Sequence, residues 1–121
     1  MKILVVDDEE MMIKTIEFHL KKLGHEVVTS SDGKEAMDKI EQENPDLIIS
    51  DIMMPFMSGF ELLSLVKTDP NRKIPVMLIS SLDEIQVIDT AIEIGADDFI
   101  IKPINLNELT LRVNRFSHKT E

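Results

Sequence analysis

Five side chains that can bind or carry a charged group stand at the ends of apolar runs in this sequence. In chain order they are Asp7, Asp8, Asp51, Ser80 and Lys102. Like charges that are held close together resist ionisation unless a cation or a hydrogen bond compensates them. A chain that gathers these carboxylates is therefore expected to hold a hard divalent cation, to carry a covalent group on one aspartate, or to do both.

Each of these residue types has a use in phosphoryl transfer. Magnesium prefers oxygen ligands and is typically held by one or two carboxylates together with a phosphate. Asp8 and Asp51 can be direct ligands, and Asp7 can act directly or through water. Asp51 can also be a nucleophile, because carboxylates form acyl phosphates. Lys102 would neutralise the phosphoryl oxygens, and the Ser80 hydroxyl would donate a hydrogen bond to one of them.

Plainer interpretations exist for single residues. Asp8 is a candidate N-cap of the helix that follows it, where acids complement the helix macrodipole. Taken alone, Lys102 would be interpreted as a solvated lysine, and Asp51 would be interpreted as a turn residue at the end of a strand. Ser81 competes with Ser80, and we favour Ser80 because it directly ends its apolar run. The combination of acids, hydroxyl and lysine favours a common site.

Short apolar runs of strand character alternate with segments of helical period. Asp32 and Ser58 precede two of the helical segments with capping-box spacing, and Gly24 and Gly95 end two others. The helix that ends at Gly95 is expected to begin after Asp83, and the fifth and last helix is expected to begin at Asn105. The expected strands are Ile3–Val6, Glu26–Thr29, Leu47–Ser50, Val76–Ser80 and Phe99–Ile101.

This alternation predicts an α/β fold with a parallel sheet covered by helices on both faces. Three of the runs are continuously apolar, as expected for strands that are buried on both sides. In such sheets ligands bind beyond the carboxyl ends of the strands, which is where all five candidate side chains fall.

Length and composition bound the function. The 121 residues fit a single domain over 1–121, with its core at about 2–116. The absence of Cys excludes disulfides and thiolate chemistry, and there is no apolar run of transmembrane length. The net charge of −10 argues against direct contact with nucleic acid or an anionic membrane. We expect a cytoplasmic protein.

The chain resembles the receiver domain of bacterial two-component response regulators, including the chemotaxis regulators. The resemblance covers about residues 2–116 and rests on motifs that are very specific in combination. It implies a flavodoxin-like (βα)5 three-layer sandwich with the five strands in the order 2-1-3-4-5. The motifs are Asp7-Asp8, Asp51 with Met54-Pro55 and Gly59, Ser80, Gly95-Ala96-Asp97-Asp98-Phe99 and Lys102-Pro103.

The resemblance also implies roles for individual residues. Asp51 would be the phosphoacceptor, and Lys102 and Ser80 would contact its phosphoryl group. The metal would be Mg²⁺, with Mn²⁺ as a substitute, and Pro103 would follow a cis peptide bond. The implied metal ligands are Asp7, Asp8, Asp51 and the backbone carbonyl of Met53.

The implied partner is a sensor histidine kinase or phosphotransfer protein, docking on the first helix and on the loop after the fifth strand. Phosphorylation would move Ser80 and Phe99 and so change the face formed by the fourth helix, fifth strand and fifth helix, which would control an output domain or partner. Asp97 and Arg112 would pair across a phosphorylation-dependent homodimer on that face.

The leading hypothesis is thus a switch that catalyses only its own phosphorylation and dephosphorylation. A small metal-dependent phosphatase also uses Asp, Ser or Thr, Lys and magnesium, but its nucleophile pattern has acids two residues apart, whereas Asp7 and Asp8 are adjacent. A pseudo-receiver that only docks partners would not need the complete set. Because Met53 and Leu82 are apolar where some relatives place polar residues, we expect slow loss of phosphate.

Overall fold

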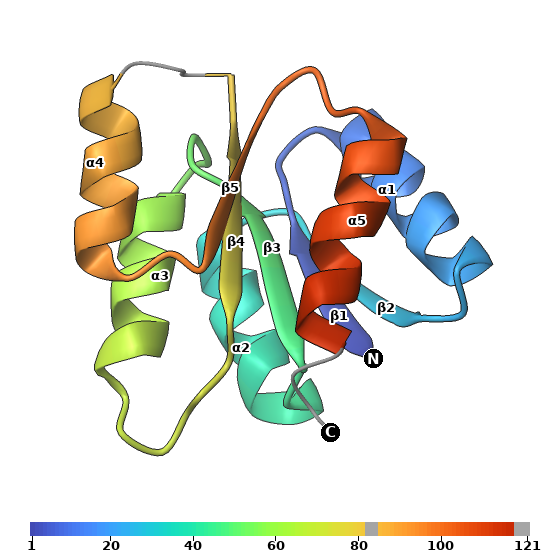
Figure 1. Ribbon diagram of the computed structural model, residues 1–121. Helices are drawn as coiled ribbons and strands as arrows, with labels where there is room; N and C mark the ends of the chain where they lie inside the picture. Colours follow the sequence, from blue (N-terminus) through green and yellow to red (C-terminus); the bar gives the residue numbers. More distant parts are fainter. Residues whose placement is uncertain (82–84, 118–121) are drawn as a thin grey trace.

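The computed structural model describes residues 1–81 and 85–117 and has the predicted alternation of strands and helices (Figure 1). The strands are β1 (Lys2–Val6), β2 (Glu26–Ser30), β3 (Leu47–Asp51), β4 (Val76–Ser80) and β5 (Asp98–Ile101). The helices are α1 (Glu10–Lys22), α2 (Gly33–Glu43), α3 (Gly59–Thr68), α4 (Ile85–Ile94) and α5 (Leu106–Ser117). The expected start of the fourth helix at Asp83 lies outside the described residues.

The five strands form one parallel sheet in the order β2-β1-β3-β4-β5, as the resemblance implied. Helices α2, α3 and α4 cover one face of this sheet, and α1 and α5 cover the other (Figure 1). All residues of β3 and β4 are buried, since both strands lie inside the sheet between the two helical layers. This is the three-layer sandwich that continuous apolar runs predict.

Local sequence signals set most of the helix boundaries. Asp32 accepts a hydrogen bond from the backbone N–H of Glu35 (2.7 Å), and Ser58 accepts one from that of Glu61 (3.2 Å), so both predicted N-caps form. Gly24 follows α1 with a φ of 97°, in the left-handed region that favours glycine. The two N-caps end the loops that follow β2 and β3 at the carboxyl edge of the sheet, where the candidate site lies.

The core consists of two apolar clusters, one on each face of the sheet. On one face Leu4, Ile48 and Leu78 pack against α2, α3 and α4, and on the other Ile49 and Met77 belong to the cluster that holds α1 and α5. Among the described helices, none is both long and apolar enough to cross a bilayer.

The core makes a direct prediction on α3, where two leucines differ in burial. Leu63 is fully buried, whereas Leu65 is 46% exposed. We expect Leu63→Ala to lower the free energy of unfolding by about 2–5 kcal/mol, because it leaves a cavity, and Leu65→Ala to change it by only about 0.5 kcal/mol. Urea denaturation of both variants measures the difference. Equal losses would contradict this packing.

Candidate functional site

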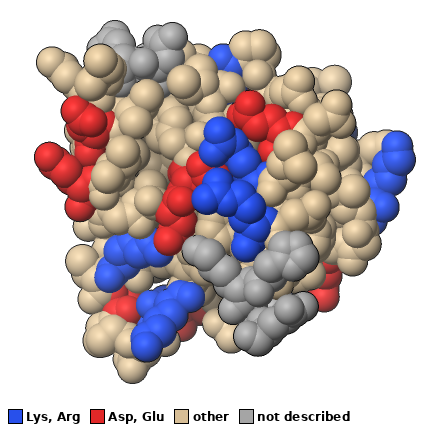
Figure 2. Space-filling view, viewed as in Figure 1, with Lys and Arg blue, Asp and Glu red and all other residues tan. Residues whose placement is uncertain are grey.

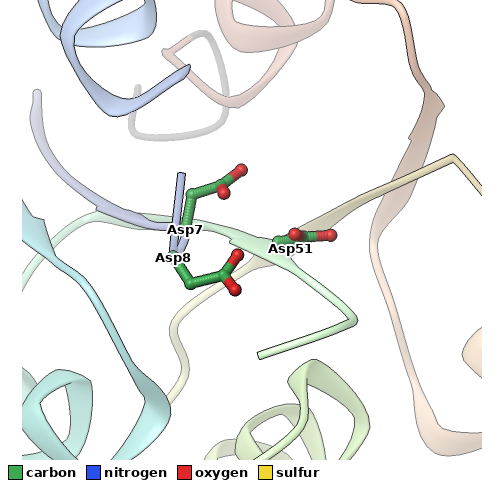
Figure 3. A group of neighbouring side chains, drawn as sticks. All are labelled: Asp7, Asp8 and Asp51. Atoms are coloured by element: carbon green, nitrogen blue, oxygen red, sulfur yellow. The ribbon is translucent and has the colours of Figure 1, made fainter. Parts of the chain in front are cut away.

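The three aspartates come together at the carboxyl edge of the sheet. Asp7 and Asp8 directly follow β1, and Asp51 is the last residue of β3, which pairs with β1. One carboxylate oxygen from each lies within 4.8 Å of the others (Figure 3). Asp7 and Asp51 are 1% and 6% exposed, whereas Asp8 is exposed. The site thus combines two buried acids with a third that is exposed, and we call this acidic cluster the pit.

Lys102 reaches the same pit from the end of β5. Its Nζ lies 3.3 Å from Oδ2 of Asp7 and 3.4 Å from Oδ2 of Asp51. The backbone N–H of Lys102 donates to the carbonyl of Ser80 (2.8 Å), which ties the lysine to the end of β4. The Lys102–Pro103 peptide bond is cis. The side chains that were singled out from the strand ends therefore share one edge.

The electrostatics of the pit follow from burial and charge. Burial, and then the nearby charge of Asp7, raise the pKa of Asp51, and they outweigh the opposing effects of Lys102 and of the Ile52 N–H. Burial lowers the pKa of Lys102, but the charges of Asp51 and Asp7 together outweigh it and raise that pKa. Lys102 thus stays protonated, yet one ammonium does not balance two buried carboxylates.

This donor set fits a hard divalent cation. All of the clustered side-chain ligands are carboxylate oxygens, the type that Mg²⁺ prefers. The resemblance drawn from the sequence implies Mg²⁺, and the cluster of Asp7, Asp8 and Asp51 is where its carboxylate ligands would lie.

Asp8 is not the cap of α1. The N-cap position is Glu9, whose side chain makes no capping hydrogen bond in the described part of the chain. Instead the Glu9 N–H donates to Oδ1 of Asp7 (2.9 Å), which helps to hold that buried carboxylate. The cap interpretation of Asp8 is therefore wrong, and the residue remains at the edge of the pit.

The remaining candidate residues lie around this centre. Met53 is 63% exposed in the loop between β3 and α3. Phe99, in β5, is half-buried against the core and lines a hollow of about 240 Å³ between α4 and β5. Ser80 is fully buried at the end of β4. Leu82, which bears on phosphate lifetime, lies outside the described residues.

Asp97, which precedes β5, and Asp98, its first residue, have different partners within the chain. Oδ2 of Asp97 accepts from Nζ of Lys67 (2.6 Å) and from the backbone N–H of Val76 (2.8 Å). Arg112 instead pairs with Asp98, and Arg115 also lies within ion-pair distance of Asp98. Basic and acidic side chains lie side by side on this face of the molecule (Figure 2). The sequence did not predict that Arg112 contacts Asp98 within the chain, because adjacent identical acids carry no signal of which one faces α5. It did not predict the contact of Lys67 with Asp97 either.

The loop between β3 and α3 holds a second unforeseen feature. Phe56 has a φ of 70° and is 88% exposed, and the N–H of Met57 donates to the carbonyl of Pro55 (2.8 Å) across it. A tight turn of this kind, with positive φ at its centre, is rare and strained for a residue other than glycine. No sequence signal predicts it, because Phe does not favour that conformation.

The raised pKa of Asp51 predicts how stability depends on pH. The pKa of Asp51 in the folded chain lies above the ordinary value of 3.8, so ionisation of this carboxyl opposes folding. The resulting loss of stability grows as pH rises from the ordinary value through the raised pKa of the folded state. With a chelator present, Asp51→Asn should raise Tm at neutral pH, and the gain should shrink on acidification toward the ordinary value.

Thermal melts over a pH series measure this effect. Asp38→Asn, at an exposed position of α2, is the matched control and should show no such pH-dependent gain. A gain for Asp51→Asn that is the same at all pH values would mean that ionisation of this carboxyl is not its cause.

Comparison with known proteins agrees with this geometry. The family model described as the response regulator receiver domain matches residues 3–114. The chain is 37% identical over 120 residues to the alkaline phosphatase synthesis transcriptional regulatory protein PhoP of Bacillus subtilis, covering 99% of the chain and 50% of PhoP. It is 37% identical over 119 residues to the probable transcriptional regulator ycf27 of Guillardia theta, covering 98% of the chain and 46% of that protein.

Solved structures show the same fold. A Francisella response regulator receiver domain aligns with a TM-score of 0.93 at 33% identity, covering 99% of this chain and 98% of that one. The Vibrio cholerae chemotaxis protein CheY4 aligns with a TM-score of 0.89 at 31% identity, covering 95% and 97%. The chain spans about half the length of the curated relatives it matches. It belongs to the response regulator receiver domains, the signalling switches of two-component systems.

Proposed function

We propose that Asp51 accepts a phosphoryl group from a phosphohistidine on a sensor histidine kinase or phosphotransfer protein. The observation that carries this proposal is the approach of Asp7, Asp51 and Lys102 in one buried pit. A carboxylate oxygen of Asp51 bonds to phosphorus while the phosphorus–nitrogen bond breaks. The electron pair stays on the imidazole nitrogen, which then takes a proton from solvent.

The side chains of the pit serve this transfer in different ways. Asp51 reacts as the carboxylate, and its low exposure keeps competing water away. Lys102 lies close enough to Asp51 to pair with the phosphoryl oxygens as charge moves onto them. Asp7, Asp8, Asp51 and the carbonyl of Met53 would hold Mg²⁺ or Mn²⁺. When bound, the metal supplies the positive charge that neutralises the phosphoryl group.

The switch would begin at Ser80. Phosphorylation adds charge and strong acceptor oxygens at Asp51, and the Ser80 hydroxyl reaches them only by moving toward the pit. Phe99 would follow by changing rotamer. Because Ser80 ends β4 and Phe99 lies in the neighbouring strand β5, this moves the face made by α4, β5 and α5. A contact made only in the phosphorylated state shifts the population toward it.

On this proposal the chain is a switch that modifies itself rather than a turnover enzyme. It would control an output domain or a partner through the α4–β5–α5 face. The net charge of −10 supports partners other than nucleic acid for this domain. The curated relatives named above are called transcriptional regulators, so control of transcription through another part of a longer protein is the output that they suggest.

A phosphorylated homodimer would use the same face. Among the described residues, the side chain of Asp97 accepts hydrogen bonds from Lys67 and Val76 through Oδ2, so its Oδ1 is the atom that would accept from Arg112 of a second copy. Arg112 would have to leave or share its partner Asp98 to reach it. The dimer would therefore replace contacts that one chain already makes, and it would form only where phosphorylation shifts the face.

Labelling with acetyl phosphate tests the phosphoacceptor. With Mg²⁺ present we expect about one phosphate per chain, seen by intact mass, and none on Asp51→Asn, because a single carboxylate is the nucleophile. Asp38→Asn should label like the wild type. Chelation should slow labelling by about tenfold or more. Steady release of phosphate from many unrelated esters would favour the phosphatase alternative.

Beryllofluoride, which mimics the phosphoryl group, tests the dimer. We expect sedimentation velocity to show more dimer when it is added, and Arg112→Ala to remove that increase. Lys73→Ala, at an exposed position outside this face, should keep it. A sedimentation profile that does not change when beryllofluoride is added would contradict the proposal.

A further inference from the structure

Gly33, the first residue of α2, lies against the loop that follows Asp51. A Cβ built at Gly33 would lie 2.6 Å from Cβ of Met57, 2.8 Å from its carbonyl oxygen and 2.9 Å from its Cγ. These distances are shorter than atoms tolerate, so only a residue without a side chain allows α2 and the loop to approach this closely.

Backbone conformation does not account for this glycine. Gly33 is helical and lies outside the left-handed region where Gly24 and Gly95 are found. Within a helix, alanine is preferred to glycine because it loses less conformational entropy. The close approach to Met57 is therefore the physical reason for glycine at this position.

The α2 side of the contact is tied to Asp7. The carbonyl of Ser30 accepts from the backbone N–H of Asp7 (3.1 Å), and the hydroxyl of this buried serine donates to the carbonyl of Asp32 (2.8 Å). Asp32 in turn caps α2. The start of α2 is therefore held to the part of the pit that carries Asp7 and Asp8.

The Met57 side of the contact is tied to Asp51. The loop closes on itself where the N–H of Gly59 donates to the carbonyl of Ile52 (2.8 Å). A Cβ at Gly59 would lie only 2.3 Å from the carbonyl oxygen of Asp51, so this closure is tight. Between these ends the loop contains the strained turn at Phe56, which leaves it little freedom to absorb a push on Met57.

We propose that Gly33 is a positioning residue for the metal site, a role that rests on the function proposed above. Its contact with Met57 joins two segments. The first is the start of α2, which is held to Asp7, and the second is the loop that follows Asp51. A Cβ at Gly33 pushes this loop outward and so moves the carboxylate of Asp51 away from those of Asp7 and Asp8. Because Mg²⁺ and Mn²⁺ need short, defined distances to oxygen ligands, a shift of a few tenths of an ångström weakens binding.

Binding of Mn²⁺ to the purified chain, followed by electron paramagnetic resonance, tests this role without phosphorylation. We expect Gly33→Ala to weaken Mn²⁺ binding by about tenfold, the size of effect seen when residues that orient metal ligands are changed. Lys34→Ala, at the next and exposed position of α2, should bind like the wild type. Wild-type affinity in Gly33→Ala would overturn the proposal.

A second control separates positioning from stability. Among the described residues nothing lies within 4 Å of a Cβ built at Gly24, whose φ of 97° makes alanine strained there. Gly24→Ala should therefore lower Tm and leave Mn²⁺ affinity unchanged. If it weakens Mn²⁺ binding as much as Gly33→Ala does, the effect is general loss of stability and the proposal fails.

The contact itself is tested by combining variants. Met57→Gly removes two of the three atoms that a Cβ at Gly33 would meet, so Gly33→Ala with Met57→Gly should bind Mn²⁺ more tightly than Gly33→Ala alone. Strictly additive effects would overturn the assignment to Met57. If Gly33→Ala does not fold, Met57→Gly alone tests the proposal. We then expect Met57→Gly to weaken Mn²⁺ binding, and wild-type affinity in this variant would contradict the proposal. A wild-type chain that binds no Mn²⁺ would instead remove the metal site on which the inference rests.

Discussion

Two buried carboxylates, those of Asp7 and Asp51, share the single ammonium group of Lys102 in this protein. The site therefore carries more negative than positive charge. Asp7 and Asp51 are almost completely shielded from water, and both lie within ion-pair distance of Lys102. Burial makes each charge costly, and the positive charge of one lysine does not offset two negative charges. The pKa of Asp51 is raised by its burial first and by the nearby charge of Asp7 second. A divalent cation relieves this excess of negative charge, because it brings positive charge to the place where it is missing.

The parallel sheet is what makes such an arrangement stable. Strands that run in the same direction end at the same edge, so residues far apart in sequence meet there without long loops. The cost of gathering the charges is offset by apolar burial on both faces of β3 and β4, whose residues are all buried. Asp51 and Ser80 are the last residues of their strands, so the sheet positions their backbone on one side and the following loops position it on the other.

The loops set those parts of the site geometry that the strands do not fix. The segment from Ile52 to Ser58 closes on itself at Gly59 and contains the strained turn at Phe56, which fixes it relative to Asp51. The charged pairs next to β5 show a similar dependence on local geometry. Asp97 binds Lys67 at the end of α3 while the adjacent Asp98 faces Arg112 of α5, because neighbouring residues where a strand begins point in different directions.

The sequence by itself determined the strands, the helices, and the meeting of Asp7, Asp8, Asp51 and Lys102 at one edge. Apolar periodicity and capping residues are local signals, and a parallel topology leaves little freedom in where the strand ends gather. Only the tertiary structure decided that Asp7 is buried while Asp8 is exposed, which acid Arg112 contacts, and that Gly33 lies against Met57. These features depend on side-chain direction and on distances of tenths of an ångström between distant segments, which no local pattern encodes.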